Sequence, residues 1–187
     1  QPSKFWGLND YMQLEGLALR IVPVRSRSDR NYSVVGSGRV DSEKVYKNVM
    51  EKFRWGNFDK IDAYVNQSYQ PSLQTMQLAM RRAAINFLEN GEKEKALELM
   101  DKYYEAFPHK NFPYDFRTWY MISVQLAAGA YERAKPHMEI LAKEMAQHLA
   151  FYESIDPMVL SSSFEDTYGL AYRTKNDLIG AARKEND

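Results

Sequence analysis

Residues 72–108 read SLQTMQLAMRRAAINFLENGEKEKALELMDKYYEAFP, and this stretch decides the fold. In its first half, apolar residues recur at spacings of three and four, the pattern of an amphipathic helix. Asn90-Gly91 then ends that helix, because glycine adopts the left-handed cap conformation without steric cost. A second apolar stripe of the same kind follows and stops at Pro108. The stretch therefore predicts two antiparallel helices joined by a tight turn. Neither helix can bury its stripe alone, so the pair needs neighbours.

A second helix pair is predicted over residues 115–155. Gly129 ends its first helix, and Ala134 follows Gly129 at the same offset at which Ala96 follows Gly91. The glycine permits the turn, and the small alanine permits close helix packing five residues later. A weaker, partial third copy is expected over residues 157–187, with Asn176 in place of the turn glycine, because asparagine is the next residue to tolerate the left-handed region.

Residues 1–70 predict a smaller N-terminal cap with extended or β structure. Residues 17–24 (LALRIVPV) and 32–35 (YSVV) have the composition of short strands. Residues 41–53 predict a helix that begins at Asp41 or Ser42. The chain is thus predicted to be mostly α, with a cap over residues 1–70 and helical repeats over residues 71–187.

Two smaller motifs in the cap have a structural interpretation. Gly36-Ser37-Gly38 lacks the lysine and the spacing of a phosphate-binding loop, so it predicts a turn. Trp55 follows the cap helix, and we expect it to cover neighbouring helices rather than to form an exposed ligand platform.

Composition limits the possible functions. Lysine plus arginine and aspartate plus glutamate number 25 each, so no net field attracts nucleic acid, and no such partner is expected. The absence of cysteine excludes disulfides and thiolate metal sites. The longest apolar stretch, residues 16–24, contains Arg20 and is too short to span a bilayer, so no direct membrane insertion is expected. Because the chain starts at Gln1, we expect it to be part of a longer protein.

The helix pairs resemble those of the tetratricopeptide family. Gly91, Ala96 and Pro108 match the turn glycine, packing alanine and terminal proline of that family, and Phe87 matches its first-helix aromatic residue. The resemblance implies antiparallel helix pairs stacked into an α–α superhelix. The second copy departs from the pattern, because Gln125 replaces the aromatic residue. Pro136 lies inside the last helix, where proline should kink the helix or delay its start.

A second resemblance covers more of the chain. Residues 6–24 (WGLNDYMQLEGLALRIVPV), residues 38–57 (GRVDSEKVYKNVMEKFRWGN) and the FPYD connector are similar to the C-terminal domain of a family of bacterial multi-spanning membrane proteins. The membrane part of that family is similar to protein O-mannosyltransferases. The resemblance implies a periplasmic domain tethered to the inner membrane by its full-length protein, and it assigns no role to any residue here.

The residues themselves carry no recognisable chemistry, and no catalytic residue, cofactor or metal ligand is predicted. His109, His137 and His148 form no pair at a spacing of three or four, and the chain contains no HExxH motif. Glu144 and His148 are helix neighbours, a pair that is usually a weak solvated contact on a surface helix.

We predict a noncatalytic module that binds or positions a protein or peptide. The membrane part of its own chain is one candidate for that partner. In stacked helix pairs, the first helix of each pair lines a concave groove. Here those residues are Arg81, Ile85, Leu88, Phe116, Trp119 and Ser123. An alternative is that Trp119 fills the core between the helix pairs and that Arg81 is a solvated surface residue. Two other functions remain open: a glycan-processing enzyme with its site between cap and repeats, and a structural spacer.

Overall fold

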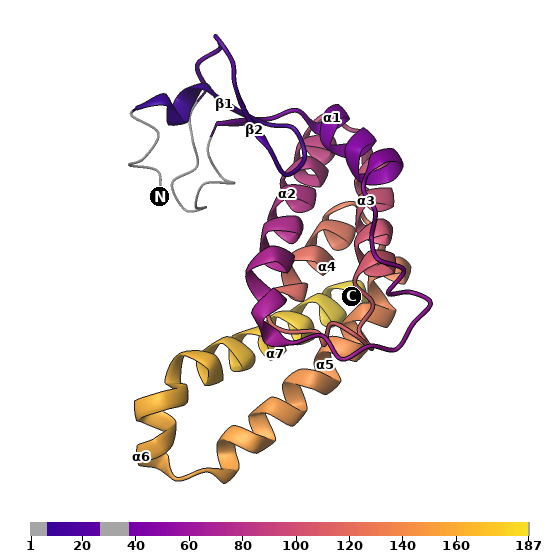
Figure 1. Cartoon of the computed structure of the whole chain (residues 1–187). Helices are drawn as coiled ribbons and strands as arrows, with labels where there is room; N and C mark the ends of the chain where they lie inside the picture. The colour runs from indigo at the N-terminus through magenta and orange to yellow at the C-terminus, as the bar shows by residue number, and fades with distance from the viewer. Residues whose placement is uncertain (1–6, 27–37, 187) are drawn as a thin grey trace. The chain divides into compact units, whose positions relative to one another are not determined.

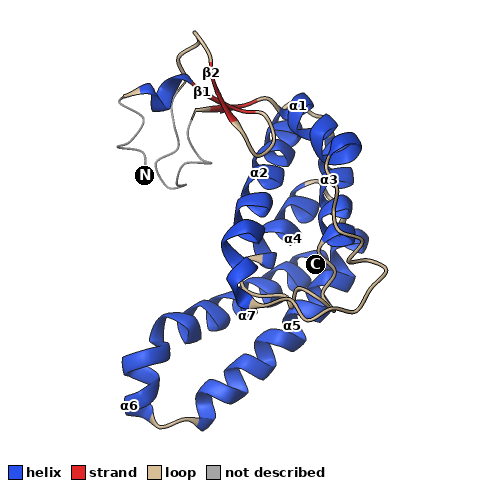
Figure 2. Ribbon diagram, in the orientation of Figure 1, coloured by secondary structure: helices blue, strands red, loops and turns tan. Residues whose placement is uncertain are grey.

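The computed structural model describes residues 7–26 and 38–186 of the 187-residue chain (Figures 1 and 2). The chain is mostly helical with a small sheet near the N-terminus, which confirms the predicted class of helix pairs with an extended cap. It divides into two compact units, Gln1–Phe112 and Pro113–Asp187. The first unit contains the predicted cap and the first helix pair.

The helices of the first unit follow the predicted pattern. Helix α1 (Ser42–Lys47) continues as a π-helical turn (Asn48–Lys52), and Asp41 caps α1 by accepting a hydrogen bond from the Lys44 backbone N–H at 3.1 Å. A short 3-10 turn (Gln67–Tyr69) leads into α2 (Gln70–Glu89), which contains Pro71 in its first turn. Helix α3 (Lys93–Ala106) follows after the turn at Gly91 and packs against α2.

The cap contains a sheet with the strand order β2-β1-β3. Strand β1 (Met12–Leu14), preceded by a 3-10 turn (Leu8–Tyr11), pairs antiparallel with β2 (Leu19–Ile21) and parallel with β3 (Arg39–Val40). Strand β2 lies within the stretch predicted as a strand, whereas the prediction for residues 32–35 falls outside the described residues. The sequence did not indicate β1, in which a glutamine separates two apolar residues, or β3, which has only two residues.

A glycine and an arginine attach this sheet to α2. Gly38 has a φ of +65°, and a Cβ atom at this position would lie 1.7 Å from the Met12 carbonyl oxygen. Only glycine therefore fits here, since the two backbones come too close for any side chain. The carbonyl of Gly38 accepts a hydrogen bond from the guanidinium of Arg82 at 2.9 Å.

Asn111 holds the irregular segment between the cap helix and α2. Its side-chain amide donates to the carbonyls of Phe58 (2.7 Å) and Ile61 (2.9 Å), and its oxygen accepts from the Ala63 N–H (2.8 Å). Asn111 is 3% exposed, so these hydrogen bonds satisfy a buried amide. They also fix the loop that precedes α2 against the segment that follows α3.

Trp55 packs edge-on against Phe53 and Phe107, with ring centroids 5.7 and 5.6 Å apart. Its indole N–H donates to the Val49 carbonyl at 3.2 Å. These contacts confirm the prediction that Trp55 covers neighbouring helices.

The second unit consists of a helix pair and a long returning helix. Helix α4 (Thr118–Ala127) packs against α5 (Tyr131–Ser154), and a turn made by α6 (Pro157–Val159) and a π-helical segment (Leu160–Phe164) leads into α7 (Glu165–Asn186). In Figure 1, α7 runs back alongside α5. Helix α5 begins at Tyr131, so Pro136 does not delay its start.

The expected third turn at Asn176 is wrong. Helix α7 is continuous from Glu165 to Asn186, and Asn176 is an exposed residue within it. An asparagine adopts the left-handed conformation only where local packing favours it, and here the buried face of Ala171, Thr174 and Leu178 continues the helix past Asn176. The last segment is therefore a single helix that packs on α5, not a third helix pair.

The turns between paired helices are as predicted. Gly91 and Gly129 have φ values of +81° and +77°, and Ala96 and Ala134 are both fully buried. The two pairs differ in proportion, because α2 and α3 have 20 and 14 residues whereas α4 and α5 have 10 and 24.

Replacement of Gly91 or Gly129 by valine should lower the free energy of unfolding by about 1–2 kcal/mol, because a β-branched residue is strained at positive φ. Gly180→Ala is the matched control. Gly180 is helical and exposed and has open space at its Cβ position, so alanine there should raise stability by about 0.5–1 kcal/mol. Urea unfolding of the three variants measures this, and parental midpoints for both valine variants would contradict the assigned turns.

Two buried glutamines make a second test. Gln77 donates to the Tyr103 hydroxyl at 2.6 Å, whereas Gln125 is fully buried and its amide has no hydrogen-bond partner among the described residues. Gln125→Leu removes an unsatisfied polar group and should raise stability by about 1 kcal/mol, and Gln77→Leu should lower it by about the same amount. Calorimetric melts that show the opposite order would contradict this account of the core.

Candidate functional site

The residues predicted to line a groove lie on two helices in two different units. Arg81, Ile85 and Leu88 lie on α2; Phe116 precedes α4, and Trp119 and Ser123 lie on α4. All six are half-buried. The Ser123 hydroxyl donates to the Tyr120 carbonyl at 2.9 Å, and the Arg117 guanidinium lies 4.4 Å from the centre of the Phe116 ring. Because the six residues belong to two separate units, a groove that they share stays a prediction.

A different apolar groove lies between α5 and α7, within the second unit. Helix α5 buries a stripe of residues at spacings of three and four, and α7 packs on it through Ala171, Thr174 and Leu178. Two open cavities of about 390 and 300 Å³ follow this helix pair on one side. They share Ala142, Leu178 and Ile179, so we treat them as one surface, the α5–α7 groove.

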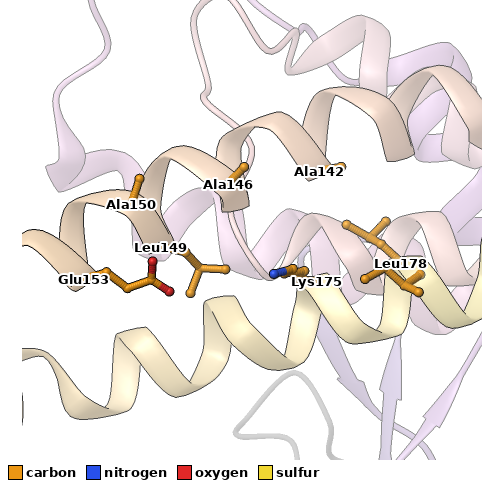
Figure 3. Close-up of a pocket in the computed structure, with 8 residues that line it drawn as sticks. Ala142, Ala146, Leu149, Ala150, Glu153, Lys175 and Leu178 are labelled. Atoms are coloured by element: carbon orange, nitrogen blue, oxygen red, sulfur yellow. The ribbon is translucent and has the colours of Figure 1, made fainter.

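The α5–α7 groove is apolar along its length and carries a few charged residues. Its first part is lined by Ala142, Ala146, Leu149, Ala150, Glu153, Lys175, Leu178 and Ile179. Figure 3 shows Leu149 and Leu178 pointing into the space between the helices. Its second part adds Tyr131, Lys135, Met138, Glu139 and Ala182.

Small side chains give the groove its shape. Ala142, Ala146 and Ala150 follow one another at a spacing of four residues on α5, and all three are exposed (Figure 3). An exposed alanine stripe beside buried leucines lets the backbone of another helix approach closely, as Ala96 and Ala134 do inside the protein. The groove can therefore accommodate a helix with apolar side chains.

Aromatic rings pack against one another near the far end of the hairpin that α5, α6 and α7 form. Tyr152 of α5 contacts Phe164 and Tyr168, with ring centroids 5.8 and 6.2 Å apart, and Tyr168 stacks on Tyr172 at 6.4 Å. Phe151 and Met158, at the same end of the hairpin, are exposed by 53% and 78%.

The cap, one side of the junction at which the enzyme alternative places its site, contains an ion-pair network. Lys44 donates to Glu15 at 2.9 Å and lies 3.1 Å from Asp41, and Gln13 donates to the same two carboxylates. The hydrogen bond from Lys44 lowers the pKa of Glu15. A carboxyl with a lowered pKa stays ionised and is a poor general acid, so the network acts mainly to bind the sheet of the cap to α1.

One histidine has a perturbed environment. The Tyr114 hydroxyl and the Nδ1 atom of His137 are hydrogen-bonded at 2.9 Å, and burial lowers the pKa of His137 to about 4. The imidazole is therefore neutral near pH 7 and joins α5 to the segment that precedes α4. Over residues 7–26 and 38–186, no group of three or more acidic or histidine side chains is placed to hold a metal ion.

Comparison with known proteins gives no assignment, because no family model, curated protein or solved structure matches this chain. Within the described residues, no helix has both the length and the apolar character needed to cross a membrane.

Sequence reasoning missed the α7 side of the groove. Tyr168, Tyr172, Lys175 and Ile179 recur at spacings of three and four and lie on one face of α7. That periodicity was visible, but the expected turn at Asn176 divided it into two short segments.

Proposed function

We propose that this chain is a noncatalytic interaction or positioning module, and that its α5–α7 groove binds a helix of a protein partner. The observation that carries the proposal is the apolar groove in which the exposed alanine stripe of α5 and the exposed Ile179 lie beside the buried Leu149 and Leu178. Helices that bind in grooves present apolar residues at spacings of three and four, and a surface of this shape receives them.

Part of the apolar side chains beside the groove is exposed to solvent. Ile179 is 39% exposed and Tyr172 is 50% exposed, although both lie on the face of α7 that borders the groove. Contiguous apolar surface of this kind is costly to leave in water, so it favours an interaction site over a spacer.

We further propose that the module belongs to a periplasmic part of a membrane-embedded, glycosyltransferase-like protein, and that its partner includes the membrane part of the same chain. This rests on the similarity of residues 6–24, residues 38–57 and the FPYD connector to the C-terminal domain of such proteins. In that arrangement, the acidic residues that catalyse glycosyl transfer lie in the membrane part, and the present chain positions a substrate or a neighbouring protein.

Site-specific photo-crosslinking in cells tests the groove. With benzoylphenylalanine in place of Ala146, the full-length protein should form a discrete adduct that mass spectrometry identifies as a protein segment. With the probe at Gln147, exposed on another side of α5, the adduct should be at least fivefold weaker. Equal labelling at the two positions would contradict the groove as a binding surface and would favour the spacer.

Fractionation tests the proposed context. The full-length gene product should sediment with the inner membrane and resist carbonate extraction, and protease added to spheroplasts should cleave residues of this domain. A full-length product recovered without membrane, or protected from protease in intact spheroplasts, would contradict the periplasmic assignment.

A further inference from the structure

We infer that the helix bound in the α5–α7 groove is amphipathic and basic, with lysine or arginine residues flanking its apolar face at the hairpin end. This inference rests on the proposed function and adds the chemistry of the partner to it.

Charge is distributed unevenly along the hairpin. Residues 144–172 contain five acidic residues and neither lysine nor arginine: Glu144, Glu153, Asp156, Glu165 and Asp166. Basic residues return on both sides, at Lys143 and at Arg173. The hairpin end is thus acidic in a chain whose net charge is zero.

Several of these carboxylates are available to a partner. Glu153, Glu165 and Asp166 are exposed, and in the part of the chain that the structure describes none of them forms an ion pair. Glu153 lines the groove itself together with Lys175 (Figure 3), and Glu139 and Lys135 line its second part, so the excess of carboxylates lies at the hairpin end and not along the groove. Asp156 differs, because its side chain caps α6 by accepting from the Met158 N–H.

The same end of the hairpin is apolar. Phe151, Met158, Val159 and Tyr172 are 53%, 78%, 46% and 50% exposed, and Tyr172 continues the groove face of α7 that contains Lys175 and Ile179. Apolar contact supplies affinity, whereas the carboxylates at the hairpin end select the sign of the partner's charge. The combination repels an anionic lipid surface and an acidic peptide, and it attracts a basic amphipathic helix.

The dimensions agree with a helix. From Tyr131 to Glu153 the groove follows 22 residue steps of α5, or about 33 Å at 1.5 Å per residue. The bound helix therefore extends over as many as about 20 residues, five to six turns.

The test uses two designed helical peptides with the same leucine face, one with lysine and one with glutamate on the polar face. Titration calorimetry with the whole protein should show that the lysine peptide binds at least tenfold more tightly at low salt. The preference should shrink at high salt, because screening weakens contacts between exposed charges.

Two sets of variants separate the hairpin from the general charge of the protein. The combined change Glu153→Gln, Glu165→Gln and Asp166→Asn should weaken binding of the lysine peptide at least threefold. The control set Glu51→Gln, Asp59→Asn and Glu89→Gln removes the same charge from exposed sites in the first unit and should leave binding unchanged.

Four results overturn the inference: equal affinity for the two peptides, no binding of either, an unaltered preference in the hairpin variant, or binding to phosphatidylglycerol vesicles that matches binding of the lysine peptide. Each of these results can be distinguished from a failure of the proposed function by the crosslinking experiment. If position 146 still crosslinks specifically in cells, the groove remains a binding surface and only the basic character of its partner is rejected.

Discussion

The close approach of paired helices at a fully buried alanine is the constraint on which this structure depends. Ala96 and Ala134 have no exposed surface, and each follows a glycine at positive φ by five residues. The glycine reverses the chain within a few residues, and the alanine methyl leaves room for the preceding helix to come near. Each pair can then bury its apolar stripes, and the rest of each unit is built against it.

In the second unit this constraint also produces the surface that we assign to binding. Helix α5 has 24 residues and α4 has 10, so α5 extends well past the length of its partner. Helix α7 runs along α5 from the level of Tyr131 to that of Glu153. Two helices do not enclose all the apolar residues that they carry, and the surface left open lies along Ala142, Ala146, Ala150 and Ile179. The long α5 that departs from a regular repeat thus provides one wall of the groove.

Features set by local chemistry could be predicted from the sequence. The Asp41 cap, the Gly91 and Gly129 turns and the helices between them depend on neighbouring residues, and the structure confirms them. Features set by distant contacts could not be predicted. Asn111 binds backbone groups about 50 positions earlier in the chain, and Gly38 is required because the Met12 carbonyl lies against it. Nothing near either residue in the sequence indicates such a partner.

The α5–α7 groove could not be predicted from the sequence for a related reason. Asn176 tolerates a turn, but the packing of Ala171 and Leu178 on α5 holds it in a helix, and tertiary contacts of this kind override local preference. The predicted groove of Arg81, Ile85, Leu88, Phe116, Trp119 and Ser123 depends on how two units are placed, which local pattern does not determine.

The most direct measurement is the NMR signal of alanine methyl groups during titration with the lysine peptide. The account predicts that the Ala142, Ala146 and Ala150 methyl signals shift together and saturate at one affinity, while those of Ala83 and Ala96, buried in the first unit, stay unchanged. Unchanged signals for the α5 alanines, or shifts of equal size in both units, would contradict the central claim that the α5–α7 groove is the binding surface.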